Sequence, residues 1–376
     1  KENVSSFMQR HHPVFEKVGY WDAVRFGADS EKMRRIRLAF GTESVVSLRT
    51  GPLSFQRISR SSIVSDGAFG VDGYFFGARL LYFEGQLNHH NHSIEYRSPV
   101  RTHFPVPQVM RPDRKQLSNH FDVIIMSEYR MHGGSTRSNI EEMVCQKRAG
   151  LRTGVVQLSR YDYPPNKRIL EEVREVLDPK TCVPIAYGET VSCDRLIIRY
   201  PPVLEHMQRH VPNIEAADIR VIVNQPPMSD YGPTGERRYH LEACARNVRA
   251  YFGKDATWHP IGPLVRDALH EHHADELRHI NLSEEDWSNI IDIEGWNLGP
   301  RVRGPQDKLR IGRHSRDSEH KWLSSANDIL AAYPASDDVV VHVLGGAETP
   351  AALIGGTPPI WSIRVFGSTH PRYFLA

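Results

Sequence analysis

The chain has 376 residues, of which 40% are hydrophobic and 24% are charged, and its formal net charge is +2. This composition is typical of a globular protein with two or three domains. The small net charge, the lack of a basic stripe with interleaved aromatic residues and the lack of a long apolar run argue against a nucleic-acid partner and against a membrane span.

The cysteines and histidines do not predict a metal site. Four cysteines are widely spaced without a Cys-x-x-Cys pair, which favours a reducing compartment over a disulfide framework or a zinc site. The 20 histidines include no His-Glu-x-x-His motif. The cluster "HHNH" (residues 89–92) could bind metal adventitiously, but we interpret it as an exposed loop.

The first part of the chain, residues 1–110, contains alternating runs such as "ESVVSL" and "GYFFGARLLYF" among many Gly, Ser and Arg residues. Alternation of apolar and polar residues is typical of half-buried strands, so we predict a β-rich segment over residues 40–110. A polar joint, "RPDRKQLSNH", separates this segment from the next region of the chain.

From Phe121 onward, short apolar runs alternate with helical stretches. Continuous apolar runs joined by helices indicate the buried parallel strands of a doubly wound α/β domain, here residues 118–280. We predict strands at "FDVIIMS", "TGVVQLS", "RLIIRY" and "IRVIVN", and helices near residues 137–149, 166–177 and 239–252.

Residues 281–306 are expected to be a linker with Trp anchors, and a second α/β domain is expected over residues 307–376. Its predicted elements are the strand "KLRIGR", a helix near residues 320–333, and strands in "VVVHVLGG" and "WSIRVFG". Ligands of open α/β sheets bind at the carboxyl ends of the strands, so we expect the ligand site in a cleft between the two sheets. The chain starts and stops inside structured sequence, and we expect a fragment of a longer protein.

Basic residues are concentrated in "IGRHSRDSEHKW" (residues 311–322). If the strand ends at Gly312 and a helix opens after the loop, three cationic side chains emerge at the carboxyl edge of the sheet: Arg313, Arg316 and Lys321. A helix N-terminus with added cations fits a phosphate or diphosphate. A solvated loop whose cations pair with Asp317 and Glu319 fits the spacing equally well.

This segment, together with "ILAAYP", "VVVHVLGG" and "IRVFG", resembles the C-terminal domain of GT-B glycosyltransferases of the retaining, family-4-like kind. The resemblance implies that Arg313 and Lys321 neutralise the diphosphate of a nucleotide-sugar donor as it leaves, where charge grows in the transition state. It implies further donor contacts from Gly312, Arg316, Phe366 and Gly367, although Phe366 could equally belong to the core.

The stretch "HGGSTRSN" (residues 132–139) resembles the loop of the same family that faces the transferred sugar and diphosphate. Gly133 and Gly134 would let a ligand approach the backbone closely, although a Gly pair is most often a tight turn. Three further residues follow predicted strands and are candidate acceptor or donor contacts: Arg199, Asn224 and Gln225. Strand termination alone explains the prolines after them.

The stretches "PVFEKVGYWD" and "GADSEKMRRI" resemble the end of a GT-A, family-2-like glycosyltransferase domain. The resemblance implies that Asp29 is the base that takes the proton of the acceptor hydroxyl. The alternative is that Asp29 caps a helix over residues 30–38. The metal motif of that fold is absent, so a divalent metal is implied only for a complete GT-A domain, and the GT-B part is expected to need no cofactor.

Together the resemblances imply a GT-B-like pair of Rossmann-like domains, the second one truncated, after an α+β remnant of a GT-A domain. They imply a hexosyltransferase-type enzyme that moves a sugar from a nucleotide-sugar donor to a glycan, a lipid-linked molecule or another hydroxyl acceptor in cell-surface polysaccharide synthesis. The paired carboxylates of the GT-B family would lie beyond Ala376, so we expect an incomplete donor site.

Two other functions fit the same residues. One is a sugar-nucleotide epimerase-like enzyme, and the other is a non-catalytic carbohydrate-binding protein with two α/β domains. The expected location is the cytoplasm, either free or peripheral to the inner face of the membrane.

Overall fold

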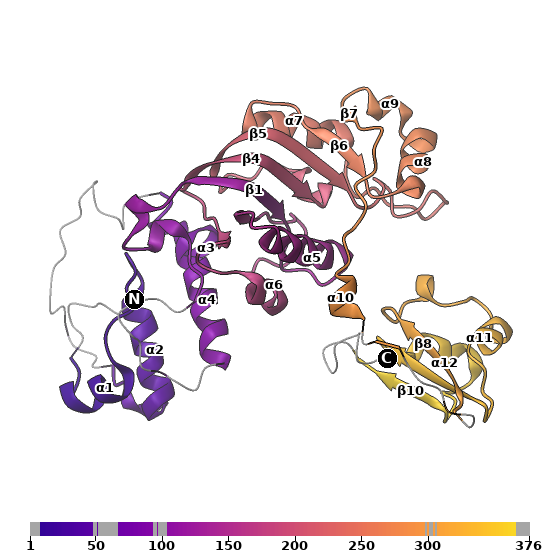
Figure 1. The fold of residues 1–376 in the computed structure, drawn as a ribbon, viewed down its shortest axis with the longest axis horizontal. Helices are drawn as coiled ribbons and strands as arrows, with labels where there is room; N and C mark the ends of the chain where they lie inside the picture. The colour runs from indigo at the N-terminus through magenta and orange to yellow at the C-terminus, as the bar shows by residue number, and fades with distance from the viewer. Residues whose placement is uncertain are drawn as a thin grey trace. The chain divides into compact units, whose positions relative to one another are not determined.

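A computed structural model describes residues 8–47, 51, 67–92, 96, 104–297, 299–300, 304 and 307–365 (Figure 1). The contacts divide the chain into two units, residues 1–291 and 292–376. The boundary between them falls inside the predicted linker.

Helices, and no strands, make up the regular structure described before residue 120. The α-helices are α1 (His11–Val18), α2 (Ala28–Phe40), α3 (Gly73–Phe76) and α4 (Ala78–His92), and short 3-10 turns are η2 (Thr42–Ser44), η4 (Gln108–Met110) and η5 (Arg114–Gln116). The prediction of a β-rich segment is therefore wrong for residues 73–92. Ala78, Tyr82 and Gly85 are buried at spacings of four and three, which is the period of a helix and not of a strand.

A seven-stranded parallel sheet forms the centre of the first unit (Figure 1). Its strand order is β3-β2-β1-β4-β5-β6-β7, so the order reverses between β1 and β4. The strands are β1 (His120–Ser127), β2 (Thr153–Gln157), β3 (Cys182–Pro184), β4 (Thr190–Arg199), β5 (Asn213–Val223), β6 (Thr257–Pro260) and β7 (Asn281–Leu282). The four strands predicted from apolar runs are confirmed, whereas the short β3 gave no such signal.

Helices cover both faces of this sheet, which is why its central strands read as continuous apolar runs. The helices of the region are α5 (Gly134–Arg148), α6 (Glu171–Val176), α7 (Leu241–Phe252), α8 (Pro263–His272), α9 (Ala274–Leu277) and the 3-10 turn η6 (Pro201–Leu204). Residues of α5 and α6 pack with Ile125 and Ile197 in one core cluster. Residues of α7 and α8 pack with Ile124 and Leu196 in the other.

The helices before the sheet pack against its β3 side. Ala186, just after β3, shares a core cluster with Ala78, Tyr82 and Phe104. Farther along α4, Glu84 pairs with the α6 residue Arg174 at 2.6 Å. These contacts place α3 and α4 beside the loops at one side of the sheet, where they help to form the pocket described below.

The second unit contains a three-stranded parallel sheet in the order β10-β9-β8. Its elements are α10 (Ile293–Trp296), β8 (Leu309–His314), the 3-10 turn η7 (Glu319–Lys321), α11 (Ala326–Ala332), β9 (Val339–Leu344), α12 (Glu348–Ile354) and β10 (Trp361–Arg364). Its core is built around Trp322, Val341 and Trp361. The predicted strands are confirmed, but the helix expected over residues 320–333 is a 3-10 turn followed by the shorter α11.

Candidate functional site

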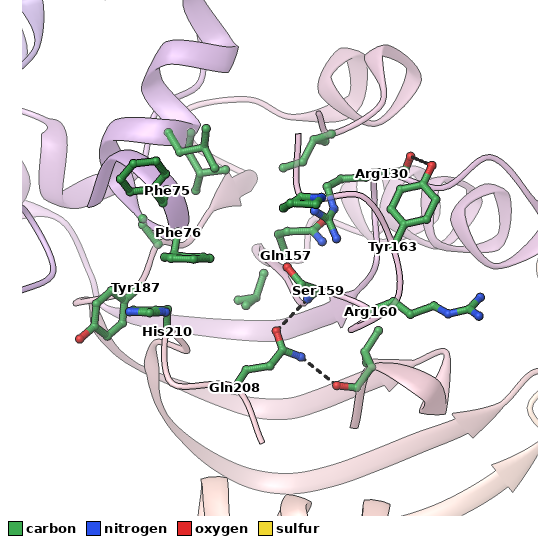
Figure 2. Close-up of a pocket in the computed structure, with 18 of the residues that line it drawn as sticks. Phe75, Phe76, Arg130, Gln157, Ser159, Arg160, Tyr163, Tyr187, Gln208 and His210 are labelled. Carbon is green, nitrogen blue, oxygen red and sulfur yellow. Dashed lines mark hydrogen bonds between the residues drawn. The ribbon is translucent and has the colours of Figure 1, made fainter. Parts of the chain in front are cut away.

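A pocket of about 470 Å³ lies beside the large sheet, in the size range of small-molecule sites (Figure 2). Segments that follow β1, β2, β3 and β4 line it, and α3 and α4 complete it. Open α/β sheets bind ligands outside the carboxyl ends of the strands where the strand order reverses, here between β1 and β4. The lining includes charged, polar and aromatic side chains: Phe76, Glu84, Arg130, Gln157, Ser159, Arg160, Lys167, Tyr187, Arg209 and His210.

Glu128, the first residue after β1, joins the segments after β1 and β2 on the polar side of this pocket. Its buried carboxylate accepts hydrogen bonds from the guanidinium of Arg130 at 2.5 and 2.7 Å and from the amide of Gln157 at 2.7 Å. It also accepts the backbone N–H of Arg160 at 2.9 Å. A buried carboxylate is stable only with such partners. Glu128 therefore fixes the ends of β1 and β2 relative to each other.

Arg160 lines the pocket next to Ser159 (Figure 2). Its Nη1 donates to the hydroxyl of Tyr200 at 2.8 Å, and its guanidinium also pairs with Asp162. Burial raises the pKa of Tyr200, so the phenol is protonated at neutral pH. Tyr200 follows β4 directly and has a φ of 78°, which among the described residues other than glycine is the only positive φ. Backbone strain of this kind is frequent at functional sites.

An aromatic wall faces the polar one across the pocket (Figure 2). The rings of Phe76 and His210 are stacked, with centroids 4.2 Å apart and an interplanar angle of 1°. Tyr187 contacts His210 edge-on at 5.1 Å, and His210 Nε2 lies 3.3 Å from a carboxylate oxygen of Asp72. Phe76 is nevertheless 52% exposed, so one face of this wall is open to a ligand.

The formal charge of the lining is positive. Four cationic side chains line the pocket, Arg130, Arg160, Lys167 and Arg209, against the single carboxylate of Glu84. Glu84 is already paired with Arg174, Arg130 with Glu128, and Arg160 with Asp162. Lys167 and Arg209 are exposed, and the described part of the chain gives neither side chain an ion-pair partner. The pocket can therefore bind an anionic group.

The glycine pair lies at the start of a helix, as the sequence predicted. Gly133 precedes α5, Gly134 is its first residue, and both are exposed. Asn224, just after β5, donates from Nδ2 to the hydroxyl of Ser135 at 2.5 Å, which ties the start of α5 to the end of β5. The structure thus brings Asn224 close to the glycine pair, but none of these residues lines the pocket.

Arg199 was expected to contact a ligand, but its side chain is 1% exposed and fully engaged within the protein. Its guanidinium donates to Asn139 at 2.8 Å, to Glu142 at 2.5 Å and to Asn289 at 3.1 Å. Those contacts clamp β4 to α5. Gln225 is half-buried, and its backbone carbonyl accepts from the hydroxyl of Tyr239 at 2.7 Å.

In the second unit, Arg313 does not emerge freely from the sheet edge as the sequence predicted. It is buried, its guanidinium lies 3.5 Å from the centroid of the Trp322 ring, and its Nη2 donates to the carbonyl of Lys321 at 2.5 Å. Burial lowers its pKa, and a contact with Tyr333 partly offsets this effect. Lys321, Arg316 and Gly312 are exposed. Phe366 and Gly367 lie outside the described residues.

Asp317, from the same loop, accepts hydrogen bonds from the backbone N–H of Glu348 at 2.5 Å and of Thr349 at 3.1 Å. Its carboxylate therefore satisfies the first N–H groups of α12. The cation pairs that the sequence suggested for Asp317 are not what holds it in this structure.

Asp29 lies in the first turn of α2, whose N-cap is Gly27, so the expectation that Asp29 caps the helix is wrong by two positions. The side chain is partly exposed. The histidine cluster at residues 89–92 is also not a loop, because it forms the last turn of α4, in which His90 is buried and lies 3.1 Å from Glu31. Within the described residues, no group of three or more His, Cys, Asp and Glu side chains could hold a metal ion.

The pocket residues Arg130, Gln157 and Arg160 were not predicted from the sequence. Polar residues directly after two predicted strands, in "MSEYR" and "QLSR", were the available signal. The predicted site rested on the basic loop with Arg313 and Lys321 instead. Phe76 and His210 carried no signal, because a stacked pair so far apart in the sequence depends on tertiary contacts.

The fold and the pocket define a mixed α/β protein with a doubly wound parallel sheet and a small-molecule pocket beside its strand ends. No family model matches the chain, and no curated protein matches it in sequence. The structure is similar to a solved structure titled as the glycotransferase of kitacinnamycin, with a TM-score of 0.31 and 12% identity over 66% of this chain and 71% of that chain. So distant a similarity identifies neither a family nor a substrate. No helix of the described residues is long and apolar enough to cross a membrane.

Proposed function

We propose that the protein is a glycosyltransferase that takes a sugar from a nucleotide-sugar donor. The observation that supports this best is the pair of parallel α/β units in one chain, the first with a doubly wound strand order and a pocket beside its strand ends. In this proposal residues 118–280 and 307–376 are the two Rossmann-like domains of a GT-B enzyme, residues 281–306 are the linker, and residues 1–110 include a GT-A remnant.

The proposed reaction forms a bond between an acceptor hydroxyl oxygen and the anomeric carbon of the donor. The bond from that carbon to the diphosphate breaks, and the leaving diphosphate receives the proton of the hydroxyl. Retention, a glycan or lipid-linked acceptor, a role in cell-surface polysaccharide and a cytoplasmic location belong to this proposal. Asp29 is retained as a proposed base for a complete GT-A domain.

The cations of the second unit divide into two roles under this proposal. Arg313 supports the loop from its buried position against Trp322, whereas Lys321 and Arg316 are accessible to a diphosphate. Fixed positive charge at the leaving group stabilises the charge that develops in the transition state.

Lys321→Ala in the full-length protein tests the donor site. We expect UDP or GDP to raise the melting temperature of the unmodified protein more than CMP does, because two phosphates offer more charge. Lys321→Ala should weaken the affinity for that nucleotide at least about tenfold, since a hydrogen bond to a charged group contributes about 1.5–3 kcal/mol. Lys308→Ala, another exposed lysine of the same unit, is the matched control and should leave the affinity unchanged.

Binding of neither UDP nor GDP would reject the proposed donor. Binding that Lys321→Ala leaves intact would reject the assigned diphosphate site. Net conversion of one nucleotide sugar into its epimer, with no sugar transferred, would favour the epimerase-like alternative.

A further inference from the structure

The two walls of the pocket in the first unit differ in chemistry, and this contrast specifies a ligand. We infer that the pocket binds a small molecule in which a phosphate is joined to a flat, largely apolar body. The inference rests on the proposed function, for which it names the class of acceptor. It concerns residues of the first unit alone and is independent of the donor residues in the second.

The cationic side provides the contact for phosphate. Arg160 lies on this side, where its guanidinium donates to the hydroxyl of Tyr200 at 2.8 Å and its charge is balanced by Asp162. Lys167 and Arg209 line the same pocket, are exposed and have no ion-pair partner in the described part of the chain. An anion bound by Lys167 or Arg209 exchanges water for charge-assisted hydrogen bonds, which are the strong kind.

The aromatic side provides the contact for the flat body. Phe76 and His210 are parallel and 4.2 Å apart, and Asp72 and Tyr187 hold His210 in this position. Four large side chains of the pocket lining are exposed: Phe75 at 64%, Phe76 at 52%, Tyr161 at 64% and Met207 at 53%. Exposed apolar surface gathered at a concave site is a common mark of ligand binding.

A single ligand accounts for both walls better than two separate ligands. A bare phosphate would leave the aromatic wall in water, and a neutral flat molecule would leave Lys167 and Arg209 unpaired. The volume of about 470 Å³ suits one small molecule. Phosphate on a flat body also occurs in nucleotides, so the experiment must distinguish a phosphorylated acceptor from a nucleotide.

Calorimetric titration of the full chain can make this distinction with four probes. These are 4-methylumbelliferyl phosphate, its neutral analogue 4-methylumbelliferyl β-glucoside, inorganic phosphate and UMP. We expect the aryl phosphate to bind at one site per chain and at least tenfold more tightly than the other three. Arg209→Gln and Phe76→Leu should each weaken that binding about tenfold or more.

Two control variants are matched to the pocket variants by residue type. Arg249→Gln removes an exposed, paired arginine that does not line the pocket, and Phe83→Leu removes an exposed phenylalanine of α4 that does not line it either. Both should bind the aryl phosphate normally. Thermal unfolding of each variant shows whether it is folded.

Several outcomes would overturn the inference. They are no binding of the aryl phosphate, equal binding of the neutral glucoside, or binding that both pocket variants leave intact. Tighter binding of UMP that is lost in Arg209→Gln would assign the pocket to a nucleotide instead. If the aryl phosphate binds as expected but UDP and GDP do not bind at all, the pocket inference stands and the proposed function fails.

Discussion

Glu189 is a buried carboxyl group that links the chain before the sheet to the loop after β3. It accepts the backbone N–H of Ala186 at 2.6 Å and of Val109 at 3.0 Å. Burial raises its pKa to about 7, although both hydrogen bonds oppose the shift. The folded protein therefore holds the proton of Glu189 more strongly than the unfolded chain does.

The sign of the resulting pH dependence follows from that difference. Between the ordinary pKa near 4.5 and the raised pKa of about 7, the folded state binds more protons than the unfolded chain does. The contribution of Glu189 to stability therefore falls as the pH rises through this window and stays constant at higher pH. Relative to Glu189→Gln, the protein should lose up to about 3 kcal/mol of unfolding free energy between roughly pH 4.5 and 8. Urea unfolding of both proteins across this range measures it, and a difference that is flat or grows with pH would be inconsistent.

Glu128 is the residue on which the polar wall of the pocket depends. Glu128→Gln keeps the shape but leaves the buried Arg130 without its carboxylate, so we expect a loss of about 3 kcal/mol in unfolding free energy. Asp255→Asn breaks the exposed pair with Arg249 and should cost less than about 1 kcal/mol. Equal effects of the two substitutions in urea unfolding would show that the Glu128 network adds no more stability than a surface pair.

At the scale of elements, the approach of the first helices to the sheet depends on Gly188. A Cβ at Gly188 would lie 2.4 Å from the Cβ of Ala68 and 3.2 Å from the ring of Phe69, and the φ of Gly188 is +92°. The segment before α3 can therefore pack against the loop after β3 only because this residue has no side chain.

Gly188→Ala should lower the unfolding free energy by about 2 kcal/mol or more, from backbone strain and from the displaced segment. Gly253→Ala separates the two causes, because Gly253 has a φ of +68° with nothing within 4 Å of its Cβ position. That control should cost about 1 kcal/mol from strain alone. The same loss for both substitutions would mean that the contact with Ala68 is not maintained.

The elements also show what the sequence could and could not reveal. β1 and β5 were predictable because strands buried on both faces are continuous apolar runs. The three-residue β3 is too short for any periodicity. The helix α4 was mistaken for strands because apolar residues that are not buried, Leu80, Leu81 and Phe83, fill the gaps in its helical pattern. The loop at Arg313 was misjudged because a guanidinium can bind carbonyl oxygens and an indole ring as well as phosphate.

At the scale of the whole molecule, the sequence was enough to predict two parallel α/β units and a ligand site beside the strand ends. It could not reveal the pocket, whose walls join Phe76 in α3 to residues after four different strands. Contacts between such distant positions depend on the tertiary fold and leave no local pattern. The residues proposed for the donor were therefore found from the sequence, whereas those proposed for the acceptor were found from the structure.

Release of nucleoside diphosphate by the full-length protein tests the central claim most directly. UDP-glucose, UDP-galactose and GDP-mannose would be offered with and without an aryl phosphate acceptor that bears a free hydroxyl, and both the nucleotide and the new glycoside would be measured. We predict that at least one donor yields equal amounts of nucleoside diphosphate and glycosylated acceptor. Binding of these donors without any transfer, or no interaction with any of them, would contradict the assignment of this fold to sugar transfer.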